Sequence, residues 1–311
     1  MKNITELLNI KYPIIQGGMA NIANHILASA VSNAGGLGLI ASGGNNGEFI
    51  RNEIRKTKEL TSNPFGVNIL LISPFASEIV NVVIEEKVPV VTTGAGNPIP
   101  YMERFKEAGI KVIPVVPSVA LAKRVEKYGA DAVIVEGTES GGHIGELTTM
   151  ALVPQVVDAV SIPVIAAGGI ADVRQVIACF ALGAKGVQVG TIMLASKECP
   201  IHENYKQKIL EAKDTDTIVT GRKTGAPVRV LKNQMAKEYI RLSDEGATLE
   251  ELEKMTLGSL RKAVVEGDTV NGSLMAGQVA GMIKEIKTVE EIIFDLFNNI
   301  DEIKNKISIM W

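Results

Sequence analysis

A glycine-rich run at residues 137–145 holds His143, one of only three histidines in the chain. The run directly follows residues 131–135, a short, largely β-branched stretch that predicts a buried strand. Glycines in a loop that leaves a buried strand let backbone N–H groups approach a ligand closely. A histidine in such a loop is a candidate acid, base or hydrogen-bond donor, although it can also simply cap or face solvent. The residues elsewhere in the chain are needed to choose between a functional and a merely structural histidine.

Two further glycine turns end strands that are predicted later in the chain. The first contains Gly168 and Gly169, and the second contains Gly190 followed by Thr191. Exposed backbone N–H groups, the N-terminus of the short helix that follows and the Thr191 hydroxyl can together bind a phosphate. Glycines that serve only the tight turns are the alternative. The sequence predicts a phosphate site because both turns follow the seventh and eighth strands, where barrels commonly hold one.

Two side-chain amides, Asn68 and Gln188, also fall at the ends of predicted strands. An amide both donates and accepts hydrogen bonds, which suits the edge of a flavin ring. In a closed core, amides without partners would be costly, so a ligand at Asn68 is the favoured interpretation. Gln188 can instead satisfy neighbouring backbone groups of the sheet.

The elements that must position these residues alternate regularly between strand and helix. The predicted strands are continuous apolar runs, which is typical of strands buried on both faces of a parallel sheet. They are expected at residues 12–19, 37–41, 65–71, 88–96, 111–118, 131–135, 163–170 and 186–194. Eight strand–helix units in about 200 residues predict an α/β fold, a (β/α)8 TIM barrel. A doubly wound open sheet is the alternative, but it more often has five or six strands and the pattern shows no switch point.

The joints between helices and the next strands repeat one feature. Gly35, Gly109, Gly129 and Gly183 each follow a predicted helix and precede a predicted strand. A residue in the left-handed conformation commonly ends a helix, and glycine adopts it without steric cost. We therefore predict that all four glycines are helix C-caps.

The pattern changes near residue 214, so we predict a barrel at 1–213 and a mostly helical segment at 214–311 that covers the barrel mouth. Thr248 with Glu251, and Thr288 with Glu291, have the spacing of capping boxes that begin helices. The apolar, glycine-rich residues 275–281 can pack closely against the barrel or a flat ligand. Simple packing between helices is the alternative for them.

Composition excludes several classes of protein. A net charge of −3 lacks the excess positive charge that general nucleic-acid binding requires. Cys179 and Cys199 fit neither a disulfide framework nor a metal site, so we expect reduced thiols, no metal and a cytoplasmic protein. The N-terminus lacks a signal-peptide pattern, and no apolar run reaches the roughly 20 residues of a membrane span.

Six motifs together resemble the nitronate monooxygenase (2-nitropropane dioxygenase) superfamily of FMN barrels. They lie at residues 14–19, 65–68, 92–98, 139–143, 163–170 and 188–191, and the resemblance extends to the tail segments at 228–234 and 272–278. Within the superfamily, the flavin-dependent enoyl-acyl-carrier-protein reductase II branch is the most similar. The nitronate-oxidising branch is expected to have glutamine where this chain has Glu136, and this difference favours the reductase.

The resemblance implies a set of FMN-binding residues at the strand ends. The phosphate would contact Gly168, Gly169, Gly190 and Thr191, and the ring would contact Gly17, Gly18, Met19, Asn68 and Gly141. Glu136, Gln188, Met275 and Gln278 complete the expected set. NADH or NADPH would reduce the flavin, and a trans-2-enoyl thioester would then accept hydride at its β-carbon. His143 would hydrogen-bond the thioester carbonyl, where negative charge develops.

A basic stretch suggests a macromolecular partner. Between residues 221 and 241 the chain carries Arg222, Lys223, Arg229, Lys232, Lys237 and Arg241 against a single acid, Glu238. In a net-acidic protein this stretch predicts a local basic face that docks the acidic acyl carrier protein, with a solvated helix face as the alternative. The resemblance also implies a homodimer. A nitronate monooxygenase and a non-catalytic flavin-binding or phosphate-ligand-binding barrel remain alternative functions.

Overall fold

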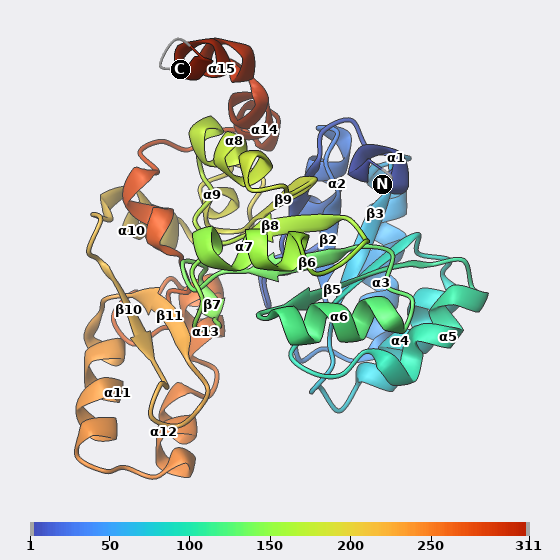
Figure 1. The fold of residues 1–311 in the computed structure, drawn as a ribbon. Coiled ribbons are helices and arrows are strands. Elements are labelled where there is room, and N and C mark those ends of the chain that lie inside the picture. The colour runs from blue at the N-terminus through green and yellow to red at the C-terminus, as the bar shows by residue number, and fades with distance from the viewer. Residues whose placement is uncertain (1–2, 309–311) are drawn as a thin grey trace.

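A barrel of eight parallel strands forms the centre of the computed structural model, which describes residues 3–308 (Figure 1). The strands are β1 (Ile14–Gln16), β2 (Gly38–Ala41), β3 (Phe65–Leu70), β4 (Val90–Gly94), β5 (Lys111–Val116), β6 (Val133–Glu136), β8 (Val164–Ala167) and β9 (Gly186–Val189). Their order is β1-β9-β8-β6-β5-β4-β3-β2, and a bridge between Ile15 and Leu37 brings the first and last of them together. The predicted (β/α)8 barrel is confirmed.

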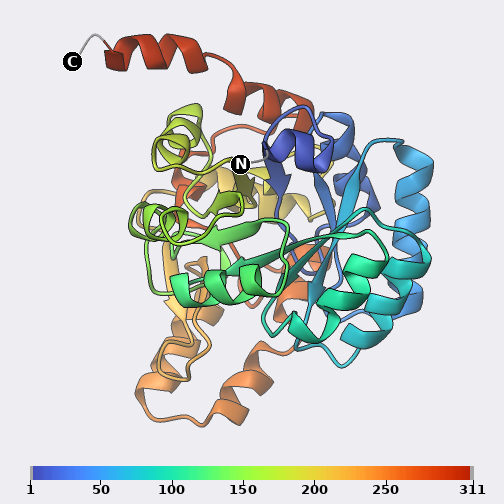
Figure 2. The ribbon, with the colours of Figure 1, turned by 45° about the vertical axis from the view of Figure 1, so that its right-hand side comes forward.

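Helices lie around the outside of these strands (Figure 2). They are α2 (His25–Asn33), α3 (Gly47–Leu60), α4 (Ala76–Glu85), α5 (Ile99–Glu107), α6 (Val119–Lys127), α7 (Thr149–Val157), α8 (Val173–Ala181), α9 (Thr191–Leu194) and α10 (Glu203–Glu211). The four predicted C-cap glycines have φ angles of 92° (Gly35), 71° (Gly109), 92° (Gly129) and 97° (Gly183). All four are in the left-handed region, so this prediction is confirmed.

Two apolar cores hold the barrel together. The smaller one closes the N-terminal end of the barrel and leaves the other end open. It fills the barrel interior with side chains such as Leu39, Ile134 and Ile165, and it includes Ile4 and Leu8 of the N-terminal helix α1 (Ile4–Leu8). A Cβ on Gly186 of β9 would lie 3.1 Å from Ile4. Because α1 closes the N-terminal end of the barrel, ligands can enter only from the end where the strands finish.

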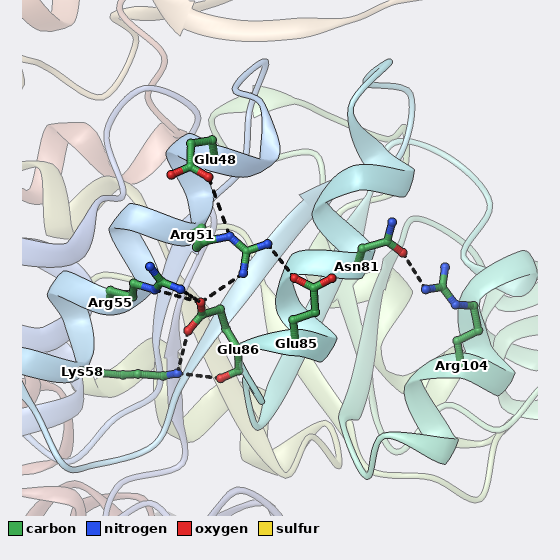
Figure 3. Close-up of polar contacts among 8 residues, drawn as sticks. All are labelled: Glu48, Arg51, Arg55, Lys58, Asn81, Glu85, Glu86 and Arg104. Carbon is green, nitrogen blue, oxygen red and sulfur yellow. Dashed lines mark hydrogen bonds and ion pairs between the residues drawn. The ribbon is translucent and has the colours of Figure 1, made fainter.

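An ion-pair network joins α3 to α4 on the outer layer (Figure 3). Glu86 accepts from Arg51 at 3.2 Å, from Arg55 at 2.9 Å and from Lys58 at 3.2 Å, while Glu85 pairs with Arg51 at 2.6 Å. Partial burial acts to raise the pKa of Glu86, but the hydrogen bonds from these three cations outweigh it and lower the pKa. The network therefore joins two neighbouring helices on the outside of the barrel.

The C-terminal segment contains a sheet that the sequence interpretation missed. Besides the helices α11 (Gln234–Asp244), α12 (Leu249–Thr256) and α13 (Ser259–Arg261), it forms the hairpin β10 (Thr217–Thr220) and β11 (Val228–Leu231). The hairpin pairs with β7 (Gly142–His143), a two-residue strand in the loop after β6. The sequence interpretation described this segment as mostly helical and did not identify these strands. A Gly-His pair carries no strand propensity, and only its pairing partner makes it one.

The same segment divides between two ends of the molecule (Figure 1). The helices α11 and α12 lie at one end, whereas α14 (Val289–Phe297) and α15 (Ile300–Ser308) lie at the other and contact α2 and α8. Both predicted capping boxes are present, at the starts of α12 and α14. Only the part before α14 can reach the open end of the barrel. No helix within residues 3–308 has the length and apolar character to cross a membrane.

Candidate active site

A ring of polar side chains lines the open end of the barrel. Ile134 and Ile165 face the barrel interior, so residues two positions further along the same strands face it too. The register places Glu136, Ala167 and Gln188 side by side across β6, β8 and β9. On the other side, Asn68 is in register with Thr92, and its Nδ2 donates to the Thr92 Oγ1 at 2.9 Å. The structure thus brings three predicted residues, Asn68, Glu136 and Gln188, to one end of the barrel.

Gly17 and Gly18 lie between the two amides of this ring. A Cβ on Gly17 would be 3.3 Å from the Gln188 Cδ, and a Cβ on Gly18 would be 2.4 Å from the Asn68 Cβ. The second distance is impossible for a real side chain, so Gly18 is required for close approach of the backbone. Met19 follows and is next to Gly190, because a Cβ on Gly190 would be 3.7 Å from its Sδ.

The two predicted phosphate turns expose backbone donors. Gly168 has φ +94° and Gly169 has φ +75°, conformations that favour glycine. A Cβ on Gly168 would also be only 2.8 Å from the Gly137 carbonyl oxygen. Among the described residues, the N–H groups of Gly169 and Thr191 find no hydrogen-bond acceptor. These donors are therefore available to an anion at the turn.

Glu136 is the ionisable group of the ring. Its side chain is half-buried at the end of β6, and the Ser140 hydroxyl donates to its Oε1 at 2.9 Å. Burial raises the pKa of this carboxyl to about 7, against the smaller lowering effect of the Ser140 hydrogen bond. Close to neutral pH the group is therefore a mixture of carboxylic acid and carboxylate.

Glu139 has a different role, although it lies only three residues away. Its carboxylate accepts from the Thr149 backbone N–H at 2.9 Å and from the Thr149 hydroxyl at 3.0 Å. It therefore ties the glycine-rich loop to the start of α7. Nothing in the sequence indicated Thr149, because its role depends on a contact across ten residues of loop.

His143 lies on β7, where its backbone pairs with Val228 of β11. Its side chain is exposed and forms no hydrogen bond within residues 3–308. The loop that carries it is in contact with the C-terminal segment, since a Cβ on Gly141 would be 2.6 Å from the Ala276 carbonyl carbon. The imidazole is therefore held by its backbone while its ring nitrogens remain available.

Residues 275–278 cross the open end of the barrel and are fixed at three points. The Tyr205 hydroxyl donates to the Met275 carbonyl at 2.7 Å, and the Gly277 N–H donates to the Thr191 Oγ1 at 2.8 Å. The Gln278 N–H donates to the Glu139 carbonyl at 2.9 Å. The Met275 side chain is half-buried and that of Gln278 is exposed. The sequence did not indicate this contact of Tyr205, because a tyrosine within an amphipathic helix normally indicates core packing.

The predicted basic face is smaller than the sequence suggested. Arg229 is only 6% exposed, so its assignment to a docking surface is wrong. Its position in β11, beneath the glycine-rich loop, accounts for its burial. Arg222 and Lys223 are exposed but neutralised by ion pairs with Glu146 at 2.9 Å and Asp244 at 2.7 Å.

Two cations of the basic stretch remain on the surface without an acidic partner in the described part of the chain. These are Lys232, just after β11, and Lys237 in α11. Arg241 is paired with Glu238 and Glu245, both at 2.6 Å. The available positive charge is therefore confined to Lys232 and Lys237.

A separate cavity of about 220 Å³ lies between α8, α9 and α14. Its walls include Asp172, Ile192 and Lys287, and none of the side chains of the polar ring lines it. We place the site at the polar ring because the ring lies at the C-terminal ends of the barrel strands and combines glycine turns with unpaired backbone donors.

The closed barrel and the polar ring at its C-terminal end define a TIM-barrel enzyme. The model of the nitronate monooxygenase family matches residues 1–82 and 75–299. The chain belongs to this family, and it is a flavin-dependent oxidoreductase.

Three relatives indicate how far the likeness extends. The structure of FabK from Thermotoga maritima is 52% identical over 100% of both chains, with a TM-score of 0.97. A (3aS,4S,5R,7aS)-5-hydroxy-7a-methyl-1-oxo-octahydro-1H-indene-4-carboxyl-CoA dehydrogenase from Mycobacterium tuberculosis is 34% identical, over 93% of each chain. A probable nitronate monooxygenase from Staphylococcus saprophyticus is also 34% identical, over 97% of this chain and 98% of that protein. The likeness is greatest to FabK among these three.

Proposed function

We propose that this protein is an FMN-dependent enoyl-acyl-carrier-protein reductase, which uses NAD(P)H to reduce a trans-2-enoyl thioester to the saturated acyl thioester. The observation that carries this proposal is the full-length likeness to FabK, an enoyl-acyl-carrier-protein reductase II. Glu136 supports it independently, because the nitronate-oxidising branch is expected to have glutamine at this position. This reaction would be the last step of a fatty-acid elongation cycle.

The residues at the open end suit FMN. The Asn68 and Gln188 amides flank a stretch of glycine backbone, and both can donate to and accept from the edge of a flavin ring. The free N–H groups of Gly169 and Thr191 suit a phosphate. Gly141, Met275 and Gln278 would bound the site from the side of the C-terminal segment.

Different groups would have different roles in the reaction. When bound, FMN would take a hydride from NAD(P)H and supply it to the β-carbon of the enoyl thioester. His143 would donate a hydrogen bond to the thioester carbonyl, whose oxygen becomes negative, and would provide the proton for the α-carbon. Residues 275–278 would exclude water from the open end of the barrel.

Nitronate oxidation is the second candidate function, supported by the family model and by the Staphylococcus saprophyticus relative. Purified protein should be yellow, and it should oxidise NAD(P)H when crotonyl thioester is added. Oxygen uptake on a nitronate, measured on the same preparation, should be much slower. The reverse pattern of rates would assign the protein to nitronate oxidation. Comparing NADH with NADPH in this assay would also identify the reductant.

The acyl carrier protein would dock beside Lys232 and Lys237, the exposed basic residues that lack an acidic partner in the described chain. Reversal of both charges, Lys232→Glu with Lys237→Glu, should raise KM for the carrier-bound substrate by about tenfold at low salt, because charge steers the encounter. The KM for a small crotonyl thioester should not change.

The matched control reverses two exposed lysines on α6, Lys123→Glu with Lys127→Glu. This control should leave both KM values unchanged. An equal rise in KM for the α6 variant would mean that net charge, and no particular surface, governs carrier binding. The homodimer implied by the family resemblance can be checked on the same samples by light scattering.

A further inference from the structure

Arg229 is a buried cation without a carboxylate partner. Its side chain is 6% exposed, and within residues 3–308 it forms no ion pair. Removing a charge from water costs free energy unless the charge is paired or fully hydrogen-bonded. Burial, and to a lesser degree the neighbouring Arg222, lower its pKa, while Glu139 partly opposes them. Burial of an unpaired charge is unfavourable, so the hydrogen bonds of Arg229 must show what the residue does in the fold.

Its contacts join the C-terminal hairpin to the glycine-rich loop. The guanidinium Nε donates to the Thr138 carbonyl at 3.1 Å, and Nη1 donates to the Thr217 hydroxyl of β10 at 3.1 Å. The backbone of Arg229 pairs with Gly142, the residue before His143. One residue therefore holds the loop near both of its ends, two residues after Glu136 and one residue before His143.

Other contacts also hold this loop: Glu139 binds Thr149 through its carboxylate and accepts from the Gln278 N–H through its carbonyl. The Ile144 N–H donates to the Pro227 carbonyl at 3.1 Å, which fixes the chain after His143. Arg222 contacts Glu146, but both side chains are exposed, and exposed ion pairs stabilise little. Between Glu136 and His143, Arg229 joins the loop to the C-terminal hairpin through both its side chain and its backbone.

We propose that Arg229 is a positioning residue for His143: its guanidinium holds the loop at Thr138 and its backbone holds it at Gly142, so that the imidazole is held over the open end of the barrel. This inference rests on the proposed role of His143 in enoyl reduction. Displacement of a catalytic group by about 1 Å can cost about 10²-fold in rate. Arg229 itself needs no contact with substrate or cofactor.

The test compares Arg229→Met, Arg229→Lys and a control, Arg241→Met. Arg241 lies on the same C-terminal segment, but its ion pairs stay within α11. In flavin-replete Arg229→Met, enoyl-thioester reduction should be slowed by about 10-fold or more, whereas flavin reduction by NAD(P)H should stay within about twofold. Arg229→Lys should recover part of the loss, since one hydrogen bond to the Thr138 carbonyl can re-form. Arg241→Met should match the native protein in both half-reactions.

A double-mutant cycle separates positioning from general structural damage. In a His143→Ala background, Arg229→Met should have almost no further effect on enoyl reduction, because the group that it positions is gone. Additive losses, or equal slowing of both half-reactions, would overturn the proposal.

Hydrogen exchange provides a readout that does not depend on the identity of the substrate. The amides of residues 138–144 should exchange faster in Arg229→Met than in the native protein, while those of α2 and α3 should not change. If the native protein failed to reduce crotonyl thioester, the proposed function would fail, and loop exchange would still test the positioning. Unchanged exchange at residues 138–144 would overturn it.

Discussion

His143→Ala should keep its FMN and reduce enoyl thioesters about 10²-fold or more slowly than the native protein. The expected loss is large because the imidazole would serve twice, as a hydrogen-bond donor to the carbonyl oxygen and as a proton source. Flavin binding should survive, since the polar ring and glycine turns lie on the barrel strands, whereas His143 is carried by β7. The KM for NAD(P)H should change little.

Stopped-flow measurement of the two half-reactions checks this prediction. Only the oxidative half-reaction, in which the thioester is reduced, should slow. His202→Ala is the matched control, because His202 is also exposed but caps α10 by accepting from the Asn204 N–H at 3.1 Å. Near-normal turnover in a flavin-replete His143→Ala protein would remove His143 from the mechanism.

Glu136→Gln should make the protein more stable above pH 7 and leave its stability near pH 4.5 unchanged. The pKa of Glu136 rises from 4.5 to about 7 on folding, so between these values the folded state binds more protons than the unfolded state. Stability then falls as pH rises through this window and stays level above it. The full difference corresponds to about 3 kcal/mol. Glutamine removes it because it carries no titrating group and can still accept from Ser140.

Denaturant unfolding at pH 5 and pH 8, with equal FMN present, measures this effect. The stability gain of Glu136→Gln should appear mainly at pH 8. Glu250→Gln, which removes an exposed charge from α12, controls for the change in net charge. If the gain were the same at both pH values, the raised pKa of Glu136 would not be its cause.

The barrel could be predicted because its determinants are local. Continuous apolar runs indicate strands buried on both faces, and a glycine after each of several helices indicates a left-handed cap. Once eight parallel strands are expected, their C-terminal ends must lie at one end of the barrel. Asn68 and Gln188, 120 positions apart in the chain, could therefore be assigned to one site without any contact between them being known.

Arg229 illustrates why other features could not be predicted. In sequence it is one of several cations in a basic stretch, and a surface role was the natural interpretation. Its burial depends on β11 pairing with a two-residue strand more than 80 positions earlier. Pairing between such short strands leaves no periodic signal, because neither strand is long enough to show alternation.

By itself, the sequence determined the barrel, the end that carries the site and most residues of the polar ring, because each depends on patterns within a single strand or turn. Only the tertiary structure decided how His143 is held, that Arg229 is buried beneath its loop and that the Glu136 carboxyl titrates near neutral pH. Burial and long-range pairing arise when distant segments pack together. Their effects on charge therefore appear only after the chain has folded.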